Sequence, residues 1–307
     1  MAEHLVPVEL DGARLDVAVH RLAPEVSRAV ARRACEIGAV AVDGVRALAT
    51  DRVRVAARVA WDDATLPLSL GLGVPVVVAD HDVLVLHKPA GLAVHGGPLV
   101  DDSIAARLAG VFPGDGAGLV HRLDREASGL LLVGRHKDAL RALASAMEQG
   151  AIRRRYLAGV AGAPSADEFV VDLPLRIVDE PQGNRPKALV DRDGGQAATS
   201  AVRVLERART ASLVAVELVS SGRTHQIRAH LAAAGHPILG DPRYGDGAAN
   251  AVARATHGIK RLLLHAHELR FASPSDGGEL VAVAVHEPDF ARLFRSLRPA
   301  HPSGSHP

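Results

Sequence analysis

The chain has 307 residues, 48% of them hydrophobic and 3% aromatic, and its formal net charge at pH 7 is +1. This length suffices for one sizeable core with a small appended domain, and no apolar run is long enough to cross a bilayer. The single cysteine, Cys35, excludes an internal disulfide, and the N-terminus lacks the features of a signal peptide. The sequence therefore predicts a cytoplasmic globular protein that does not enter a membrane.

The first 65 residues form a pattern of their own. Apolar residues alternate over 6–10 as in a strand, and a short helical pattern follows around 17–22. Ser27 is placed to cap a second helix that ends at Gly38. An Asp-Gly pair at 43–44 predicts a tight turn between two strands. Residues 66–75, rich in Gly and Pro, are interpreted as a linker.

Three arginines, Arg28, Arg32 and Arg33, lie off the apolar stripe of the second helix. They could bind RNA phosphates, or they could form an ordinary solvated helix face. The net charge of the whole chain does not decide between the two, because nucleic-acid binding depends on where positive side chains cluster more than on the net charge.

Residues 76–297 predict an α+β core, because hairpins and helices are interleaved without a regular parallel repeat. One helix is predicted to begin at a cap formed by Asp138 and to end at Gly150. The other expected elements are strands at 76–78, 83–86, 152–160 and 213–219, a turn at 80–82 and a helix at 224–234. The last ten residues, 298–307, are rich in Pro, Ser, Gly and His and are expected to be disordered.

The segment 121–132 (HRLDREASGLLL) places one carboxylate between two guanidiniums, directly before an apolar strand. The flanking charges of Arg122 and Arg125 favour the ionised form of Asp124, and an ionised carboxylate can act as a nucleophile. The alternative is a loop salt bridge without catalytic meaning.

This segment resembles the catalytic motif of the RluA-type pseudouridine synthases, in which His-Arg-Leu-Asp is followed by two variable residues and Thr-Ser-Gly-Leu-Leu. Ala127 is the departure, since Thr is usual there. Five segments in register make the resemblance specific. The other four are 87–95 (HKPAGLAVH), 155–160 (RYLAGV), 221–230 (SGRTHQIRAH) and 236–245 (HPILGDPRYG).

The resemblance implies a pseudouridine synthase catalytic domain with a mixed, largely antiparallel sheet, and it implies three catalytic residues. Asp124 would be the nucleophile, attacking the ribose or the base, and Arg223 would pair with it. Tyr156 would pack on the target base, and Arg122 would fill the gap left by the extruded uridine. Two alternatives stay open, a phosphate contact for Arg223 and a core role for Tyr156. The expected RNA-binding arginines are Arg28, Arg32, Arg33, Arg122, Arg125, Arg154, Arg155 and Arg228.

The order of elements in residues 1–65 resembles an S-four-like RNA-binding module, although Thr50-Asp51 stands where Gly-Asp is usual. The predicted function is thus isomerisation of specific uridines to pseudouridine in large-subunit ribosomal RNA. The alternatives are the same reaction on transfer RNA, a non-catalytic RNA-binding or ribosome-assembly factor, and a glycosidase, which lacks a convincing second acid.

Sixteen histidines raise the question of a metal, and His265 and His267 would share one strand face. Neither a cysteine nor a clear carboxylate stands at ligand spacing, so the prediction is no metal site. The reaction requires no cofactor, and we expect a monomer.

Overall fold

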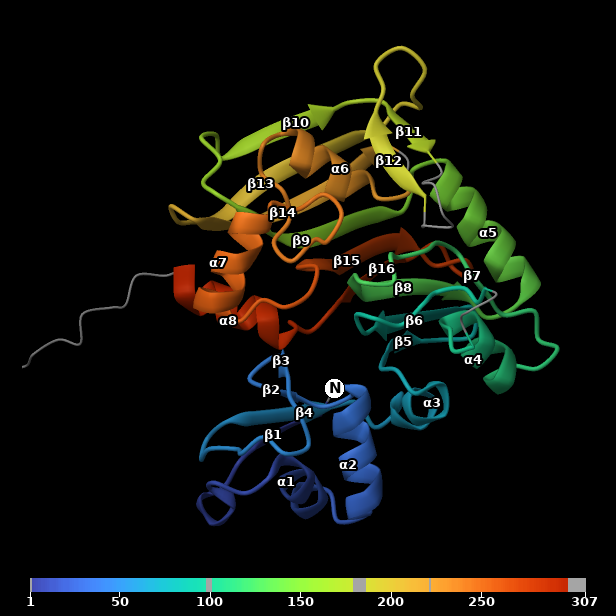
Figure 1. Cartoon of the computed structure of the whole chain (residues 1–307). Helices are drawn as coiled ribbons and strands as arrows, with labels where there is room; N and C mark the ends of the chain where they lie inside the picture. The colour runs from blue at the N-terminus through green and yellow to red at the C-terminus, as the bar shows by residue number, and fades with distance from the viewer. Residues whose placement is uncertain (1, 98–100, 179–185, 221, 298–307) are drawn as a thin grey trace, which may run out of the picture. The chain divides into compact units, whose positions relative to one another are not determined.

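The computed structural model describes residues 2–97, 101–178, 186–220 and 222–297 (Figure 1). The predicted disordered tail, 298–307, lies outside the described residues. The chain divides into two compact units: unit 1 comprises Met1–Tyr156 and His265–Pro288, and unit 2 comprises Leu157–Leu264 and Asp289–Pro307. The predicted boundaries at 65 and 75 therefore both fall within unit 1.

The N-terminal part of unit 1, called here the N-terminal module, is a four-stranded sheet with two helices beside it (Figure 1). Its strands, in the order β1-β4-β2-β3, are β1 (Ala2–Leu5), β4 (Arg58–Trp61), β2 (Ala41–Val42) and β3 (Val45–Arg46), and its helices are α1 (Leu15–Leu22) and α2 (Arg28–Ile37). Trp61 and residues of α1 and α2 form its own apolar core.

Two local predictions in this module are confirmed. Ser27 Oγ accepts the backbone N–H of Val30 at the start of α2, and Gly38 ends the helix in the left-handed conformation. Asp43 and Gly44 both have positive φ, which is the geometry of a two-residue hairpin turn between β2 and β3.

The strand predicted at 6–10 is wrong. The strand lies earlier, at Ala2–Leu5, and Val8–Leu10 forms a 3-10 helix. Pro7 stands between them and has no backbone N–H to donate to a sheet, so pairing stops before it.

The segment interpreted as a linker contains helix α3 (Leu66–Leu72), which ends at Gly73 in the left-handed conformation. Leu66 and Leu72 are buried. Apolar side chains that recur along the segment thus favour a helix despite its glycines and prolines. Its role as a linker stays a prediction.

In the remainder of unit 1 the strands of a sheet follow the order β5-β6-β8-β15, with β16 also paired to β15 and β7 also paired to β8. β8 and β15 are parallel, whereas β5–β6, β6–β8, β7–β8 and β15–β16 are antiparallel. The strands are β5 (Val76–Ala79), β6 (Val83–Lys88), β7 (Gly118–Leu119), β8 (Ser128–Gly134), β15 (Leu264–Ala272) and β16 (Glu279–Val283), and the helices are α4 (Ile104–Val111) and α5 (Lys137–Glu148).

One face of this sheet carries the buried core of unit 1. Val83 and Val85 of β6 lie there with Leu130 and Leu132 of β8 and with side chains of β15 and α5. The predicted helix at α5 is present, but its N-cap is His136, whose Nδ1 accepts the backbone N–H of Ala139. The prediction that Asp138 caps it is wrong, because Asp138 lies in the first turn.

Unit 2 contains three antiparallel strands in the order β10-β13-β14 and a separate hairpin, β11–β12. The chain enters it within β9 (Arg153–Ala161) and leaves it at the start of β15. Its elements are β10 (Glu168–Asp172), β11 (Leu175–Val178), β12 (Lys187–Val190), β13 (Thr199–Arg207), β14 (Ala211–Ser220), α6 (Gln226–Ala233), α7 (Gly247–His257) and, from its second residue, α8 (Pro288–Leu297).

These elements confirm the predicted fold class, an α+β protein with a mixed, largely antiparallel sheet. Among the described residues, no helix has the length and apolar character needed to span a membrane.

Candidate active site

The motif that contains Asp124 forms the connection between β7 and β8, called here the catalytic loop (residues 120–127). Its first two residues are fixed to β8: the Val120 N–H donates to Leu132 O, and the Leu132 N–H donates to Nε2 of His121 at 3.1 Å. Inside the loop the Ala127 N–H donates to Asp124 O at 3.1 Å, which closes a tight turn. Asp124 therefore projects from a turn that rigid strands support.

The loop is also clamped to the segment after β6. The Gly91 N–H donates to Arg125 O at 2.7 Å, and Arg125 Nε donates back to Gly91 O at 2.8 Å. This reciprocal pair joins residues more than thirty positions apart in the sequence.

Lys88, at the end of β6, is completely buried, and its ammonium group donates to four backbone carbonyls. Two of them, Pro89 O and Leu92 O, both at 2.9 Å, belong to the segment after β6, and two, Arg125 O at 3.1 Å and Ala127 O at 2.6 Å, flank the turn of the catalytic loop. A buried charge is tolerated only when such partners replace water. Lys88 thus holds the backbone on both sides of Glu126.

Sequence reasoning missed Lys88, because a lysine that follows a predicted strand shows no sign of burial in the sequence. Its position one residue before Pro89 in the HKPAGLAVH segment was the available signal. Its carbonyl partners in the catalytic loop lie 37 and 39 positions away and are not visible in a local pattern.

Gly129, directly after the loop, allows β8 and β15 to approach closely. Its φ is +114°, and a Cβ at this position would lie 2.2 Å from the carbonyl oxygen of Ala266. Both the backbone conformation and the space therefore require glycine. The neighbouring Ser128 is buried, and its Oγ is hydrogen-bonded to Nδ1 of His265 at 2.9 Å.

Tyr156 and Asp124 lie close enough for their charges to interact. Burial raises the pKa of Tyr156; the positive charge of Arg154 opposes the rise and the negative charge of Asp124 adds to it. The phenol therefore keeps its proton at neutral pH. Desolvation, with the charge of Arg154, lowers the pKa of His121 to about 4, so this imidazole is neutral at pH 7. Unit 1 thus brings together Asp124, Tyr156, Arg154 and His121.

The arginines expected to contact RNA differ in exposure. Arg122 and Arg125 are exposed at the catalytic loop, and Arg155 is partly exposed and lies 3.6 Å from Glu268. Arg154 is only 8% exposed and lies inside the cluster with Tyr156. A buried guanidinium cannot easily reach an RNA phosphate. Its charge instead acts on the neighbouring side chains of Tyr156 and His121.

Arg228, in α6 of unit 2, corrects another expectation. It is 1% exposed, and its Nε and Nη2 each donate to Asp241 at 2.8 Å. Its guanidinium also lies 5.1 Å from the ring centre of Tyr244. A buried guanidinium engaged in a bidentate pair serves the fold of unit 2, so we do not retain Arg228 as an RNA contact.

Arg223 also belongs to unit 2 and lies just before α6. Its side chain is exposed, and its backbone N–H donates to Oε1 of Gln226 at 3.0 Å. Unit 2 thus holds the backbone of Arg223 in place by a local side-chain contact. The predicted pairing of Arg223 with Asp124 stays a prediction.

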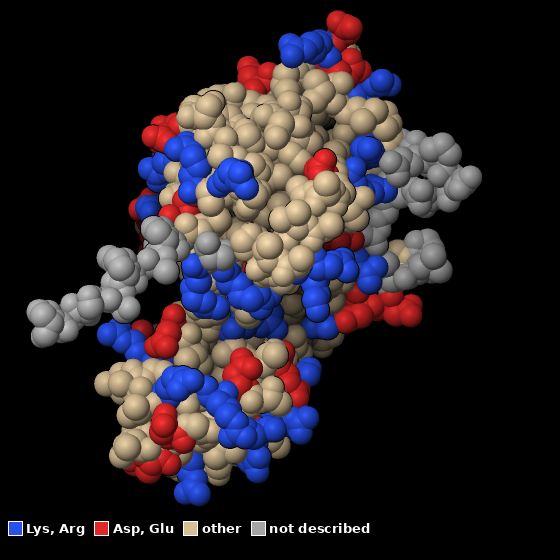
Figure 2. Space-filling model, turned by 60° about the vertical axis from the view of Figure 1, so that its left-hand side comes forward, with Lys and Arg blue, Asp and Glu red and all other residues tan. Residues whose placement is uncertain are grey.

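In the N-terminal module the three arginines of α2 are well exposed. The side chains of Arg28, Arg32 and Arg33 are 60%, 65% and 57% exposed; Arg32 Nε donates to Glu36 at 2.9 Å, and Arg28 and Arg33 lie 3.7 and 3.8 Å from Asp16 and Glu36. Figure 2 shows basic side chains gathered on one face of the molecule, several of them over this module, with acidic side chains among them. The arginines are therefore available to a polyanion.

The described residues contain one set of three side chains that could hold a metal, and it is not the pair considered from the sequence. His81, Asp82 and His136 have ligand atoms within 4.8 Å of one another. Both imidazoles are already hydrogen-bonded to Oδ1 of Asp82, at 2.6 and 2.9 Å. His136 Nδ1 accepts a hydrogen bond at the start of α5, so Nε2 carries the proton that it gives to Asp82. This tautomer suits a hydrogen-bonded triad rather than a metal ligand.

Comparison with known proteins adds an independent line of evidence. A family model described as RNA pseudouridylate synthase matches residues 82–233, and an S4 domain model matches residues 13–59. Ribosomal large subunit pseudouridine synthase D of Xanthomonas campestris pv. campestris is 34% identical over 97% of this chain and 93% of its own length. Ribosomal large subunit pseudouridine synthase C of Haemophilus ducreyi is 35% identical over 73% of this chain and 69% of its own length.

The solved structure of Human RNA Pseudouridylate Synthase Domain Containing 4 superimposes with a TM-score of 0.59, at 24% identity, over 74% of this chain and 94% of that one. This likeness supports the fold. The similarity to the Xanthomonas enzyme over nearly the whole of both chains goes further: the chain belongs to the RluA family and is an RNA pseudouridine synthase, with an S4 domain at its N-terminus.

Proposed function

We propose that this synthase isomerises uridines in large-subunit ribosomal RNA and that Asp124 is its nucleophile. The observation that carries the proposal is the catalytic loop, which holds Asp124 on a turn fixed by Lys88, Gly91 and β8 and beside the protonated phenol of Tyr156. The names of the two bacterial relatives, both ribosomal large subunit pseudouridine synthases, support the choice of RNA.

The reaction rearranges one nucleoside without any co-reactant. The bond between N1 of uracil and C1′ of ribose breaks, the base turns, a bond forms between C5 and C1′, C5 loses its proton and N1 gains one. A carboxylate adduct with the ribose or the base would hold the separated part while the base turns. The side chain of Asp124 supplies that carboxylate.

Tyr156 and Arg223 complete the proposed chemistry. The ring of Tyr156 stacks on the target base, and its hydroxyl, protonated at neutral pH, assists the movement of the proton from C5 to N1. Arg223 pairs with Asp124 and orients the carboxylate. Arg122, exposed on the catalytic loop, enters the RNA helix in place of the extruded uridine.

Residues 1–65 are proposed to act as the RNA-binding module and 76–297 as the catalytic domain. Arg28, Arg32 and Arg33 would bind phosphates of structured RNA, with Arg125 and Arg155 contributing nearer the catalytic loop. We further propose that the enzyme acts in the cytoplasm as a monomer.

The decisive experiment is to incubate the full chain with unmodified large-subunit ribosomal RNA and, separately, with unmodified transfer RNA, and to map pseudouridines in each. We expect modification of ribosomal RNA at specific uridines. Modification of transfer RNA alone would overturn the substrate, and an absence of pseudouridine in both would favour a non-catalytic RNA-binding factor.

Asp124→Asn tests the nucleophile. The amide keeps the shape of the carboxylate but cannot form the adduct, so we expect pseudouridine formation to disappear while RNA affinity changes by less than about twofold. Full activity of this variant would exclude the mechanism.

Arg223→Met tests the pairing. We expect kcat to fall more than RNA affinity, because the substitution leaves Asp124 without its orienting partner. A loss confined to affinity would instead identify Arg223 as a phosphate contact.

A further inference from the structure

Unit 1 contains a series of buried polar side chains, each in contact with the next, that the mechanism does not use. The series begins at Ser128, which follows the catalytic loop. The Oγ of Ser128 is hydrogen-bonded to Nδ1 of His265 at 2.9 Å. The ring of His265 meets the ring of His87 edge-on, with 5.3 Å between the ring centres. Nε2 of His87 lies 3.2 Å from Oε1 of Glu287, which lies 3.5 Å from Nη1 of Arg46.

Each of these groups is withdrawn from water. Ser128 and His265 are 0% exposed, His87 is 1% exposed, and the side chains of Glu287 and Arg46 are 9% and 16% exposed. Buried polar groups are held in fixed geometry, because losing a partner costs far more there than at the surface. Ser128 and His265 share a hydrogen bond, whereas His87 contacts His265 by ring packing and lies beside the Glu287 carboxylate, with no hydrogen bond from its Nε2 to any described residue. A displacement at one end of this series therefore shifts the side chains packed against it.

The far end of this series of side chains, Arg46, lies in the N-terminal module. Arg46 belongs to β3, and its Nη2 donates to the carbonyl oxygen of Glu36 at 3.4 Å, at the end of α2. A Cβ on Gly38 would lie 2.2 Å from Nε of Arg46, so the glycine that ends α2 also makes room for this guanidinium. Arg46 thus contacts the helix that carries the exposed arginines.

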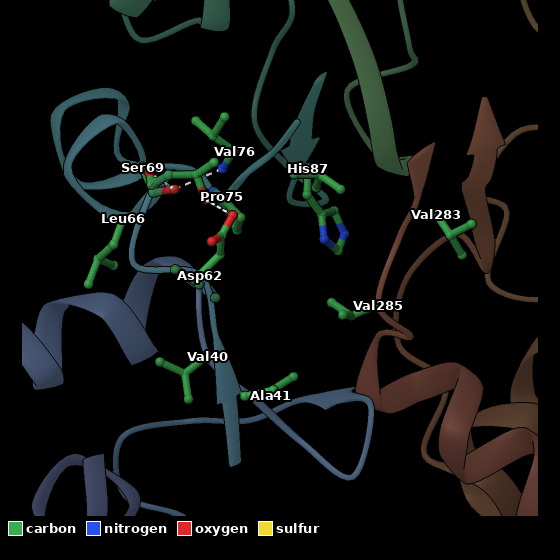
Figure 3. Close-up of a pocket in the computed structure, with 15 residues that line it drawn as sticks. Val40, Ala41, Asp62, Leu66, Ser69, Pro75, Val76, His87, Val283 and Val285 are labelled. Atoms are coloured by element: carbon green, nitrogen blue, oxygen red, sulfur yellow. Dashed lines mark hydrogen bonds between the residues drawn. The ribbon is translucent and has the colours of Figure 1, made fainter. Parts of the chain in front are cut away.

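The backbone joins the same two regions. The Arg46 N–H donates to His286 O at 3.0 Å, and the His286 N–H donates to Gly44 O. Beside this contact is a small cavity of about 90 Å³, partly open to solvent, into which His87 points and which Val40, Ala41, Val283 and Val285 line (Figure 3). Because apolar packing is incomplete there, the polar contacts of Arg46 carry a larger share of the docking of the module.

We propose that Arg46, Glu287, His87 and His265 form a relay of positioning residues that couples the N-terminal module to the catalytic loop through Ser128. The module then does more than bind RNA: its docking holds the Ser128 end of the loop, and with it the orientation of Asp124. The inference rests on the proposed catalytic role of Asp124.

The test uses full-length variants in which one link is broken. Arg46→Met removes the charge that faces Glu287, Glu287→Gln keeps the shape but removes the carboxylate, and the double variant removes both. Arg58→Met is the matched control, because Arg58 lies in the same module with a side chain 67% exposed and a weak pairing to Glu3. Arg46→Lys tests rescue by a retained positive charge.

Two measurements are made on each variant. Hydrogen–deuterium exchange of the peptide covering 121–132 reports the order of the catalytic loop without any substrate. Single-turnover and steady-state kinetics on ribosomal RNA separate kcat from KM.

We expect faster exchange of 121–132 and a kcat about tenfold lower in Arg46→Met and Glu287→Gln, equivalent to about 1.4 kcal/mol, with KM within about twofold of the wild-type value. The double variant should lose no more than the worse single variant, because both break one relay, and Arg46→Lys should recover most of the loss. Arg58→Met should match the wild type in both measurements.

Wild-type exchange of 121–132 and a wild-type kcat in Glu287→Gln would overturn the relay, as would an equal loss in Arg58→Met. If Arg46→Met proves unfolded by its melting curve, Glu287→Gln and Arg46→Lys decide. A wild-type enzyme inactive on every RNA would refute the proposed function, whereas the exchange data would still decide the relay.

Discussion

Lys88 lies completely buried among four backbone carbonyls, and Lys88→Met removes the ammonium group while keeping an unbranched apolar side chain. Each hydrogen bond to a charged group contributes about 1.5–3 kcal/mol, but three N–H donors shared among four carbonyls do not all reach that value. Lys88→Met leaves these buried carbonyls without their donor, and an unsatisfied buried acceptor costs about 1–3 kcal/mol. We therefore expect a loss of about 4 kcal/mol in the free energy of unfolding.

Such a loss is a large part of the 5–15 kcal/mol that stabilises a typical domain, and it corresponds to a fall of about 10 °C in Tm. The assay is urea and thermal unfolding of Lys88→Met beside Lys137→Met, in which the substituted lysine is exposed. Turnover should also fall in Lys88→Met, because the carbonyls of Arg125 and Ala127 lose their common anchor. A loss below about 1 kcal/mol with full turnover would refute the anchoring role.

Three further outcomes are expected. Tyr156→Phe keeps the stacking ring and should lower kcat about 100-fold with little change in KM, as measured by single-turnover kinetics; an unchanged kcat would leave Tyr156 only the stacking role. Replacing Arg28, Arg32 and Arg33 together with Gln should make the slope of log K against log salt concentration about two units less steep in filter binding, whereas an unchanged slope would identify a merely solvated face. The folded-state pKa of His121, about 4, lies below the unfolded value of about 6.5. The unfolded chain therefore binds the extra proton between these values, and stability should fall by up to about 1.4 kcal/mol per pH unit as the pH drops from about 6.5 to about 4. Urea unfolding across this range checks it, and a His121→Gln variant with the same pH slope would contradict it.

Local signals predicted the local structure well. Ser27 and Gly38 bound α2 as expected, and the Asp43-Gly44 pair forms the expected turn. Capping and positive φ depend on a few neighbouring residues, so one sequence suffices to predict them. The same reasoning failed at α5, where His136 caps the helix and Asp138 does not, because an imidazole nitrogen can replace the usual capping oxygen.

Long-range partners set the limit of prediction at the site. The motif identified Asp124, but the burial of Lys88 depends on carbonyls 37 and 39 positions away. Arg228 was expected to contact RNA, but its guanidinium donates two hydrogen bonds to Asp241, thirteen positions later in the sequence. A charged residue looks the same in a sequence whether it meets solvent or a buried partner, so only the folded chain separates the two.

Unit 1 is built from two stretches that are far apart in the sequence, and this separation affects how the chain folds while it is being synthesised. Residues 1–156 and 265–288 build this unit together, and β15, the parallel neighbour of β8, comes from the second part. On the ribosome, at about 5–20 residues per second, roughly 7 to 26 seconds separate the synthesis of Tyr156 from that of the last residues of the unit. During that interval the Ser128–Gly129 end of β8, which pairs with β15 in the finished fold, has no partner strand on that side. An unpaired strand edge invites misassociation and gives chaperones a reason to engage the nascent chain. Prematurely terminated chains that stop before β15 should consequently be inactive even though they contain Asp124 and Tyr156.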